Sequence, residues 1–166
     1  MIIEKRKFKI LSGLLNEEEY SYTISLPKEI NIIFNAFKKH HKKLYVVGGA
    51  VRDVLMKKIP KDFDLTTDAI PEEVERILKS EGIHAYPKGE KFGVISAIIN
   101  DQEFEIAAFR KESYDGGDGR RPTSVEFTDL ETDSSRRDFT INALYFDIDK
   151  KKIIDLVGGV KDIENN

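Results

Sequence analysis

A pair of glycines, an arginine and two aspartates fall within one short stretch, VVGGAVRDVLMKKIPKDFDLTT, at residues 46–67. Gly48 and Gly49 stand where an apolar strand gives way to a short helix, so their backbone N–H groups can approach an anion closely. Arg52 follows one helical turn later and can donate two hydrogen bonds to phosphate oxygens. A close-packed turn with Arg52 in a surface ion pair fits the same residues. Neither GxGxxG nor GxxxxGK[ST] occurs, so neither a dinucleotide-binding motif nor a P-loop is supported.

The two aspartates, Asp62 and Asp64, have the spacing of two carboxylates on one face of a strand, roughly 6.5 Å apart along the chain. Mg²⁺ typically takes one or two carboxylates and completes its shell with water and substrate phosphate oxygens. An ordinary half-buried strand would also alternate acids with Phe63 and Leu65. The pattern predicts a catalytic magnesium site held by Asp62 and Asp64.

A third carboxylate is needed if two metal ions are to lie roughly 3.5–4 Å apart for an in-line displacement. In QEFEIAAF, Phe104 and Ile106 take one face of a strand and Glu103 and Glu105 take the other. Glu105 lies deeper in the strand and is the predicted third catalytic carboxylate. A solvated hairpin face is the alternative.

The stretch RRDFTINAL, residues 136–144, has core positions and polar positions that could line a cleft. Arg137 suits a phosphate or a metal-bound triphosphate. Asp138 or Asn142 could hydrogen-bond sugar hydroxyls, the groups that distinguish RNA precursors from DNA precursors. Taken alone, the stretch also fits a capped helix with salt bridges.

Apolar periodicity places these residues on a mixed set of helices and strands. We expect a hairpin-like appendage at residues 1–25 and a single domain over residues 26–166. Within that domain the expected elements are a helix from Pro27, a strand at Leu44–Val47, helices at Ala50–Met56 and Pro71–Glu81, a strand around Asp62–Thr66, hairpins at Val94–Phe109 and Tyr145–Leu156, and a flexible loop at 111–123. The predicted fold class is α/β (α+β), with a mixed sheet covered by helices mainly on one face.

Composition narrows the setting of this domain. The chain is 40% hydrophobic and 34% charged and has no cysteine, which favours a soluble, cytoplasmic protein without disulfides or thiolate zinc sites. No apolar run approaches the length of a membrane span. The net charge of −3 neither requires nor forbids a nucleic-acid partner, although basic residues gather locally, as in KKHHKK and GRR.

Together the motifs resemble the head domain of the class II tRNA nucleotidyltransferase and bacterial poly(A) polymerase family. GGAVRDVLMKKIPKDFDLTT is similar to the family's first motif, and RRDFTINAL is similar to its second. PEEV, FEIAAFR, GRRPTSVEFTDL and IIDLVGGVKDI also fit the linking segments. The likeness runs from about residue 26 to the C-terminus.

The resemblance implies a nucleotidyltransferase fold in which Asp62 and Asp64 hold Mg²⁺. It implies that Gly49 and Arg52 lie at the triphosphate and that Arg137 lies at the nucleotide, with Arg110 as a further nucleotide-binding candidate. The implied chemistry is attack of the 3′-hydroxyl of tRNA on the α-phosphate of CTP or ATP, with release of pyrophosphate.

In the family, a helical neck with a Glu-Asp-x-x-Arg motif selects the base, and a body and tail grip tRNA. This sequence ends at KDIENN, before those parts would begin. CCA addition is the leading prediction. A poly(A) polymerase, a CC-adding or A-adding enzyme, and a non-catalytic nucleotide-binding module remain as alternatives.

Overall fold

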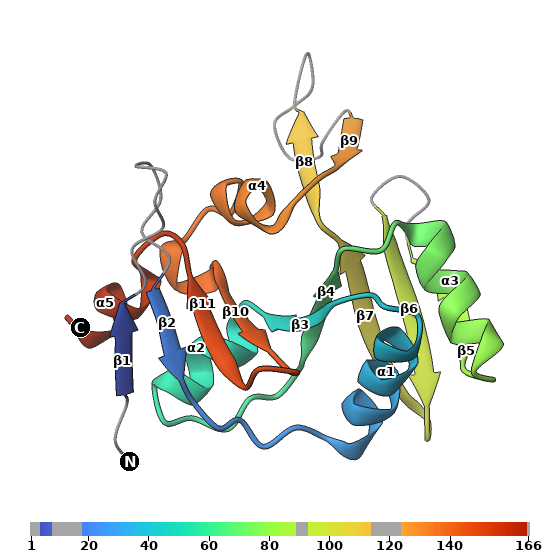
Figure 1. The fold of residues 1–166 in the computed structure, drawn as a ribbon, viewed down its shortest axis with the longest axis horizontal. Helices are drawn as coiled ribbons and strands as arrows, with labels where there is room; N and C mark the ends of the chain where they lie inside the picture. The colour runs from blue at the N-terminus through green and yellow to red at the C-terminus, as the bar shows by residue number, and fades with distance from the viewer. Residues whose placement is uncertain (1–3, 8–17, 89–92, 114–123, 166) are drawn as a thin grey trace. The chain divides into compact units, whose positions relative to one another are not determined.

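The computed structural model describes residues 4–7, 18–88, 93–113 and 124–165. These residues form two compact units. The first unit contains residues 1–26, 45–64 and 137–166, and the second contains residues 27–44 and 65–136. Figure 1 shows the elements of both along the chain.

The first unit is built on antiparallel strands in the order β1-β2-β11-β10-β3. Its strands are β1 (Glu4–Lys7), β2 (Glu18–Ser21), β3 (Leu44–Val47), β10 (Leu144–Asp147) and β11 (Lys152–Asp155). Its helices are α2 (Gly49–Leu55), the 3₁₀ turn η1 (Thr140–Asn142) and α5 (Gly159–Glu164). All residues of β3 and β10 are buried, and α2 contacts β10, η1 and α5. The core of this unit therefore lies around β3 and β10.

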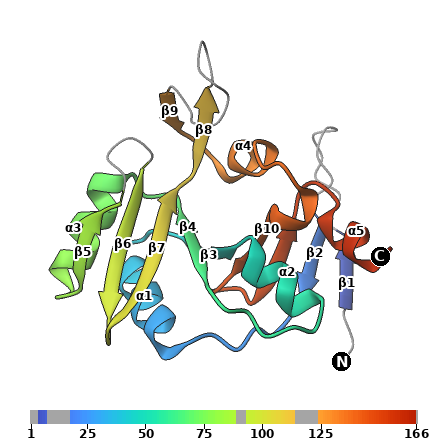
Figure 2. The same ribbon diagram turned by 180° about the vertical axis from the view of Figure 1, so that it is seen from behind.

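The second unit has a mixed sheet in the order β4-β7-β6-β5, where β4 and β7 are parallel and the other pairs antiparallel. Its strands are β4 (Asp64–Thr67), β5 (His84–Pro87), β6 (Val94–Ile99) and β7 (Gln102–Ala108), with a separate pair β8 (Arg110–Ser113) and β9 (Ser124–Phe127). Its helices are α1 (Lys28–Lys39), α3 (Pro71–Ser80) and α4 (Leu130–Ser135). Figure 2 shows β5, β6 and β7 side by side with α3 against them. The predicted mixed α/β fold class is confirmed.

α1 and α3 begin and pack as their sequences predict. In α1, Ile30, Ile33 and Phe37 recur at three- and four-residue spacing and are fully buried. α3 begins at Pro71, and the carboxylate of Glu73 accepts a hydrogen bond from the backbone N–H of Ile70 at 3.1 Å. The first turn of α3 is thereby capped.

The hairpin of β6 and β7 also follows its sequence. Asn100 and Asp101 have φ of 50° and 60°, as a two-residue hairpin turn requires, and Ile99 pairs directly with Gln102. Phe104 and Ile106 are buried while Glu103 and Glu105 are exposed, so the predicted alternation along β7 is confirmed.

In the N-terminal segment, β1 and β2 pair antiparallel. β2 also pairs with β11, with Ser21 opposite Lys152, so this segment extends the sheet of the first unit.

Three local expectations are wrong. β4 begins at Asp64, so Asp62 lies outside the strand and the argument that both aspartates share a strand face does not hold. Residues 111–113 belong to β8, whereas residues 114–123 of the expected loop lie outside the described residues. RRDFTINAL is not a helix of its own: Arg136 ends α4, Thr140–Asn142 form the 3₁₀ turn η1, and Leu144 begins β10.

Periodicity did not predict β5, β8, β9, α4 or α5, all of which have only four to six residues. Within the described ranges, no helix combines the length and the apolar character that crossing a membrane requires.

Candidate functional site

The glycine turn of the first motif lies between β3 and α2. Gly48 has φ +75° and ψ −129°, a backbone conformation that residues with a side chain rarely adopt. Its N–H donates to the carbonyl of Leu144 at 3.1 Å, and its own carbonyl accepts from the N–H of Arg52 at 3.1 Å. A Cβ added to Gly48 would lie 3.6 Å from the carbonyl oxygen of Asn142 and 3.9 Å from Nη1 of Arg137. The turn therefore packs against the second motif.

Arg52 on α2 is held in place from two sides. Its Nε and Nη2 donate to Oδ1 of Asp53 at 3.0 and 2.8 Å, and its Nη1 donates to Oδ1 of Asn142 at 2.8 Å. The side chain is still 31% exposed. This arrangement fixes the direction of the guanidinium and leaves part of it open to a ligand.

Arg137 is positioned by an aromatic ring. Its guanidinium carbon lies 5.5 Å from the ring centroid of Tyr145, and its Nε donates to the Tyr145 hydroxyl at 3.2 Å. Tyr145 is fully buried in β10 and packs edge-to-face on Tyr45 of β3. A rigid aromatic pair thus supports the arginine.

The structure therefore brings together Gly48, Arg52, Arg137 and Asn142 from two motifs far apart in the sequence. Gly49 belongs to the same turn, and a Cβ there would lie 3.5 Å from Nη2 of Arg52. Gly48 is buried and its N–H is bonded to Leu144, whereas Gly49 is half-buried. Two guanidinium groups beside this turn can bind a polyphosphate through charge-assisted hydrogen bonds.

The carboxylates Asp62, Asp64 and Asp138 belong to the same unit and are exposed. Asp138 follows Arg137 directly. Among the residues that the structure describes, no group of three or more His, Cys, Asp or Glu side chains could hold a metal ion. A hard divalent cation can be held by only one or two carboxylates when water and substrate phosphates supply its remaining ligands.

Glu105 and Arg110 lie in the second unit, and each has a charged partner there. Glu105 accepts from Nζ of Lys88 at 2.7 Å, and Lys88 also donates to Glu103 at 2.9 Å. The hydroxyl of Ser96, then Lys88 and Tyr86, lower the pKa of Glu103 to about 2. The hydrogen bonds to both carboxylates raise the pKa of Lys88.

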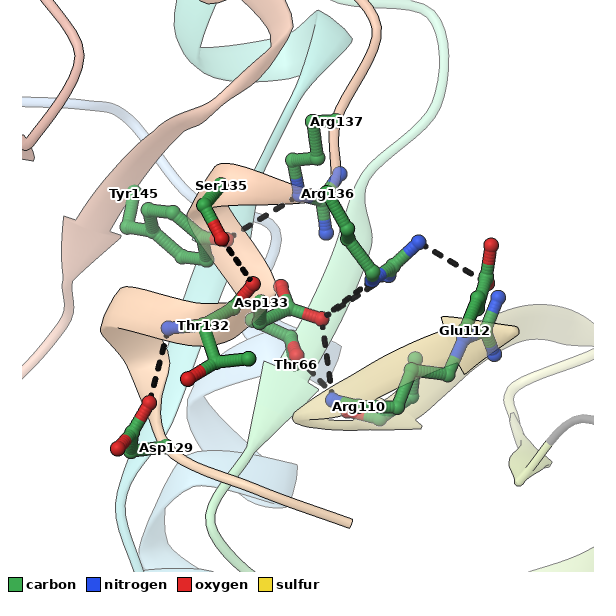
Figure 3. Close-up of polar contacts among 11 residues, drawn as sticks. Thr66, Arg110, Glu112, Asp129, Thr132, Asp133, Ser135, Arg136, Arg137 and Tyr145 are labelled. Carbon is green, nitrogen blue, oxygen red and sulfur yellow. Dashed lines mark hydrogen bonds and ion pairs between the residues drawn. The ribbon is translucent and has the colours of Figure 1, made fainter. Parts of the chain in front are cut away.

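Arg110 takes part in a charged network that the sequence reasoning missed (Figure 3). Its Nε donates to Oε1 of Glu112 at 2.8 Å, and Arg136 donates to the same oxygen at 3.0 Å. Asp133 on α4 is completely buried and accepts from Nε of Arg136 at 3.0 Å and from the backbone N–H of Arg110 at 3.2 Å. The network joins β8 to α4 within the second unit.

Two sequence signals could have pointed to this network. Asp133 and Arg136 have the i, i+3 spacing of a helical ion pair. Arg110 and Glu112 have the i, i+2 spacing that places side chains on one face of a strand.

Comparison with known proteins identifies the family. A sequence profile described as "Poly A polymerase head domain" matches residues 44–166, which is most of the chain. The chain belongs to this family.

Named relatives of the chain are CCA-adding enzymes. The enzymes of Staphylococcus aureus strains MRSA252 and Newman are each 39% identical over 142 residues, which cover 85% of this chain and 34% of the relative. The chain therefore spans about a third of the length of these relatives.

Solved structures agree with the family. The Bacillus stearothermophilus CCA-adding enzyme in complex with CTP is 33% identical with a TM-score of 0.66, covering 85% of this chain and 32% of that one. A tRNA nucleotidyltransferase complexed with a primer tRNA and an incoming ATP analog is 28% identical with a TM-score of 0.59, covering 80% of this chain and 36% of that one.

Proposed function

We propose that this chain is the catalytic head of a template-independent RNA nucleotidyltransferase that adds CMP and AMP, from CTP and ATP, to the 3′ end of tRNA. The observation that carries the proposal is the meeting of the two family motifs at Gly48, Arg52, Arg137 and Asn142. The named CCA-adding relatives support the choice of substrates. We further propose that residues 26–166 are the head domain, that residues 1–25 are an addition to it, and that the protein works in the cytoplasm.

In this proposal the residues of the first unit divide the work. Arg52 and Arg137 bind the triphosphate, and the backbone of Gly48 and Gly49 lets it approach. Asp138 and Asn142 are the proposed partners of the ribose hydroxyls. Together these residues would hold the α-phosphate in line with the attacking hydroxyl, which lowers the entropic part of the activation barrier.

Asp62 and Asp64 would hold Mg²⁺, with Glu105 as a further candidate carboxylate. When bound there, Mg²⁺ would favour ionisation of the RNA 3′-hydroxyl and neutralise charge on the departing pyrophosphate. Arg52 and Arg137 would stabilise the same negative charge through their guanidinium groups. To bind the nucleotide, Arg110 would have to exchange its ion pair with Glu112 for a phosphate oxygen.

The test of the proposal uses the protein encoded by the complete gene, tRNA trimmed of its 3′-terminal CCA, labelled CTP or ATP, and Mg²⁺. The parent should add two cytidylates and one adenylate. Asp64→Asn should reduce the single-turnover rate by more than about a hundredfold without lowering the thermal midpoint, because the amide keeps the shape but loses the charge that binds Mg²⁺.

Asp101→Asn is the matched control, because Asp101 is an exposed carboxylate in the β6–β7 turn, where an asparagine is equally tolerated. Activity of Asp64→Asn within tenfold of the parent would remove the metal assignment. Long adenylate tracts would identify a poly(A) polymerase, and triphosphate binding without transfer would identify a binding module.

A second measurement concerns base choice. The 166-residue chain should bind CTP and ATP with Mg²⁺ and distinguish them weakly, since the proposed contacts address phosphate, ribose and metal. Hydrogen bonds to base edges are worth roughly 1–3 kcal/mol of discrimination each elsewhere. A tenfold preference in a calorimetric titration would place base selection within these residues.

A further inference from the structure

The turn that leads from β11 into α5 has a fixed shape. The carboxylate of Asp155, which is 1% exposed, accepts hydrogen bonds from four consecutive N–H groups. These are the N–H groups of Val157 at 3.2 Å, Gly158 at 2.8 Å, Gly159 at 3.0 Å and Val160 at 3.0 Å. A buried carboxylate that is satisfied in this way holds the turn rigidly.

This turn packs closely against η1. A Cβ added to Gly159 would lie 2.8 Å from the carbonyl carbon of Thr140, and still closer to its carbonyl oxygen. The φ of Gly159 is not in the left-handed region, so the close approach, rather than the backbone conformation, excludes a side chain. The hydroxyl of Thr140 also donates to the carboxylate of Asp162 on α5. α5 therefore contacts η1 at two points.

η1 in turn carries a residue of the candidate site. The N–H of Asn142 donates to the carbonyl of Phe139 at 3.0 Å, and the N–H of Ala143 donates to that of Thr140 at 3.0 Å. These bonds make η1 a single short turn, so a shift of Thr140 displaces Asn142. The side-chain oxygen of Asn142 accepts a hydrogen bond from Nη1 of Arg52. The backbone carbonyl oxygen of Asn142 lies 3.6 Å from the position that a Cβ on Gly48 would take.

We propose that Gly159, Thr140 and Asp162 are positioning residues that set the direction of the Arg52 guanidinium through Asn142. None of the three is among the residues proposed to contact the triphosphate. The inference rests on the proposed function in one respect, namely that the anion that Arg52 receives is a nucleoside triphosphate. The role of α5 is then to hold η1 at the distance that Arg52 requires.

The first test compares two adjacent glycines of the same turn. Gly159→Ala must push the Thr140 carbonyl away, so binding of ATP with Mg²⁺ should weaken about tenfold or more. Gly158→Ala strains a residue with φ +86°, but nothing lies within 4 Å of the added Cβ. It should lower the thermal midpoint and leave the affinity within twofold of the parent. Equal affinities of both variants and the parent would overturn the inference.

A second pair of variants serves if Gly159→Ala does not fold. Thr140→Val removes the hydroxyl that donates a hydrogen bond to Asp162, and it should weaken ATP binding about three- to tenfold. Thr140→Ser keeps a hydroxyl and should bind ATP as the parent does. A merely structural role would lower the thermal midpoint of Thr140→Val and leave the ATP affinity of its folded protein unchanged, and that result would contradict the proposal.

A double-mutant cycle shows whether the effect passes through Arg52. In an Arg52→Ala background, Gly159→Ala or Thr140→Val should weaken ATP binding much less than in the parent. Additive losses would refute the route through Asn142. If the parent itself binds no triphosphate, the proposed function fails, whereas normal binding by the parent and by every variant overturns only the positioning role.

Discussion

Replacing Arg52 with alanine should weaken triphosphate binding strongly and change stability little. The guanidinium makes three hydrogen bonds within the protein, two to Asp53 and one to Asn142, and remains 31% exposed. We expect it to bind phosphate oxygens with the exposed part. A charge-assisted hydrogen bond is worth about 1.5–3 kcal/mol, so Arg52→Ala should weaken binding of ATP with Mg²⁺ by roughly 10- to 150-fold.

The stability effect should be much smaller. The pair with Asp53 is part-exposed and contributes about 0–1 kcal/mol after screening by solvent, and the Asn142 bond adds a similar amount. A loss of about 1 kcal/mol lowers the melting temperature of a domain of this size by about 2–4 °C. Arg52→Lys keeps the charge but not the planar fork, so it should bind ATP with intermediate affinity.

The assay is a calorimetric titration of ATP with Mg²⁺ at about 0.15 M salt, with thermal unfolding measured on the same samples. Arg76→Ala is the matched control. Arg76 lies on α3, its side chain is 74% exposed, and its Nη2 is 3.9 Å from Glu73, so its loss should change neither affinity nor stability measurably. The reasoning is refuted if Arg52→Ala binds ATP within threefold of the parent, or if Arg76→Ala weakens binding equally.

Three further changes test other parts of the structure. Gly48→Ala should lower the free energy of unfolding by about 1–3 kcal/mol in urea denaturation, because φ is +75° while no atom crowds the new Cβ; an unchanged midpoint would contradict this. Asp155→Asn replaces one acceptor oxygen with an NH₂ group that cannot accept from the N–H of Val160, so the free energy of unfolding should fall by about 1–3 kcal/mol. A fall of less than about 0.5 kcal/mol would be inconsistent with this role of Asp155. The folded state lowers the pKa of Glu103 from 4.5 to about 2, so its ionised form stabilises the protein above pH 4.5 and this contribution is lost as the pH falls toward 2. The difference in melting temperature between the parent and Glu103→Gln should therefore become smaller as the pH falls from about 5 to about 3. A difference that stays constant over this range would show that ionised Glu103 does not stabilise the folded protein.

Much of the fold followed from local patterns. The three- and four-residue spacing of Ile30, Ile33 and Phe37 predicted α1, and Asn100-Asp101 predicted the β6–β7 turn. Both signals arise within a few residues, from one apolar helix face and from two residues that tolerate positive φ. The paired motifs likewise predicted the family that residues 44–166 match.

The short helices and strands could not be predicted from local sequence patterns. β8, β9 and α4 contain four to six residues each, too few to show a period, and they depend on partners elsewhere in the chain. Asp133 is buried at 0% exposure because Arg136 and the N–H of Arg110 satisfy it, and nothing in TDSSRR alone requires that. Burial of a charge depends on the groups that surround it, which only the folded chain supplies.

The sequence by itself determined which chemical groups the candidate site contains, because residue types and short spacings limit what each motif can bind. Only the tertiary structure decided how those groups are held: Asn142 pairs with Arg52, Arg137 lies over Tyr145, and Gly159 contacts Thr140. These contacts join residues from distant parts of the chain. The physical reason is that strand pairing between β3 and β10 brings the two motifs to one place, and long-range pairing of this kind leaves no trace in the spacing of neighbouring residues.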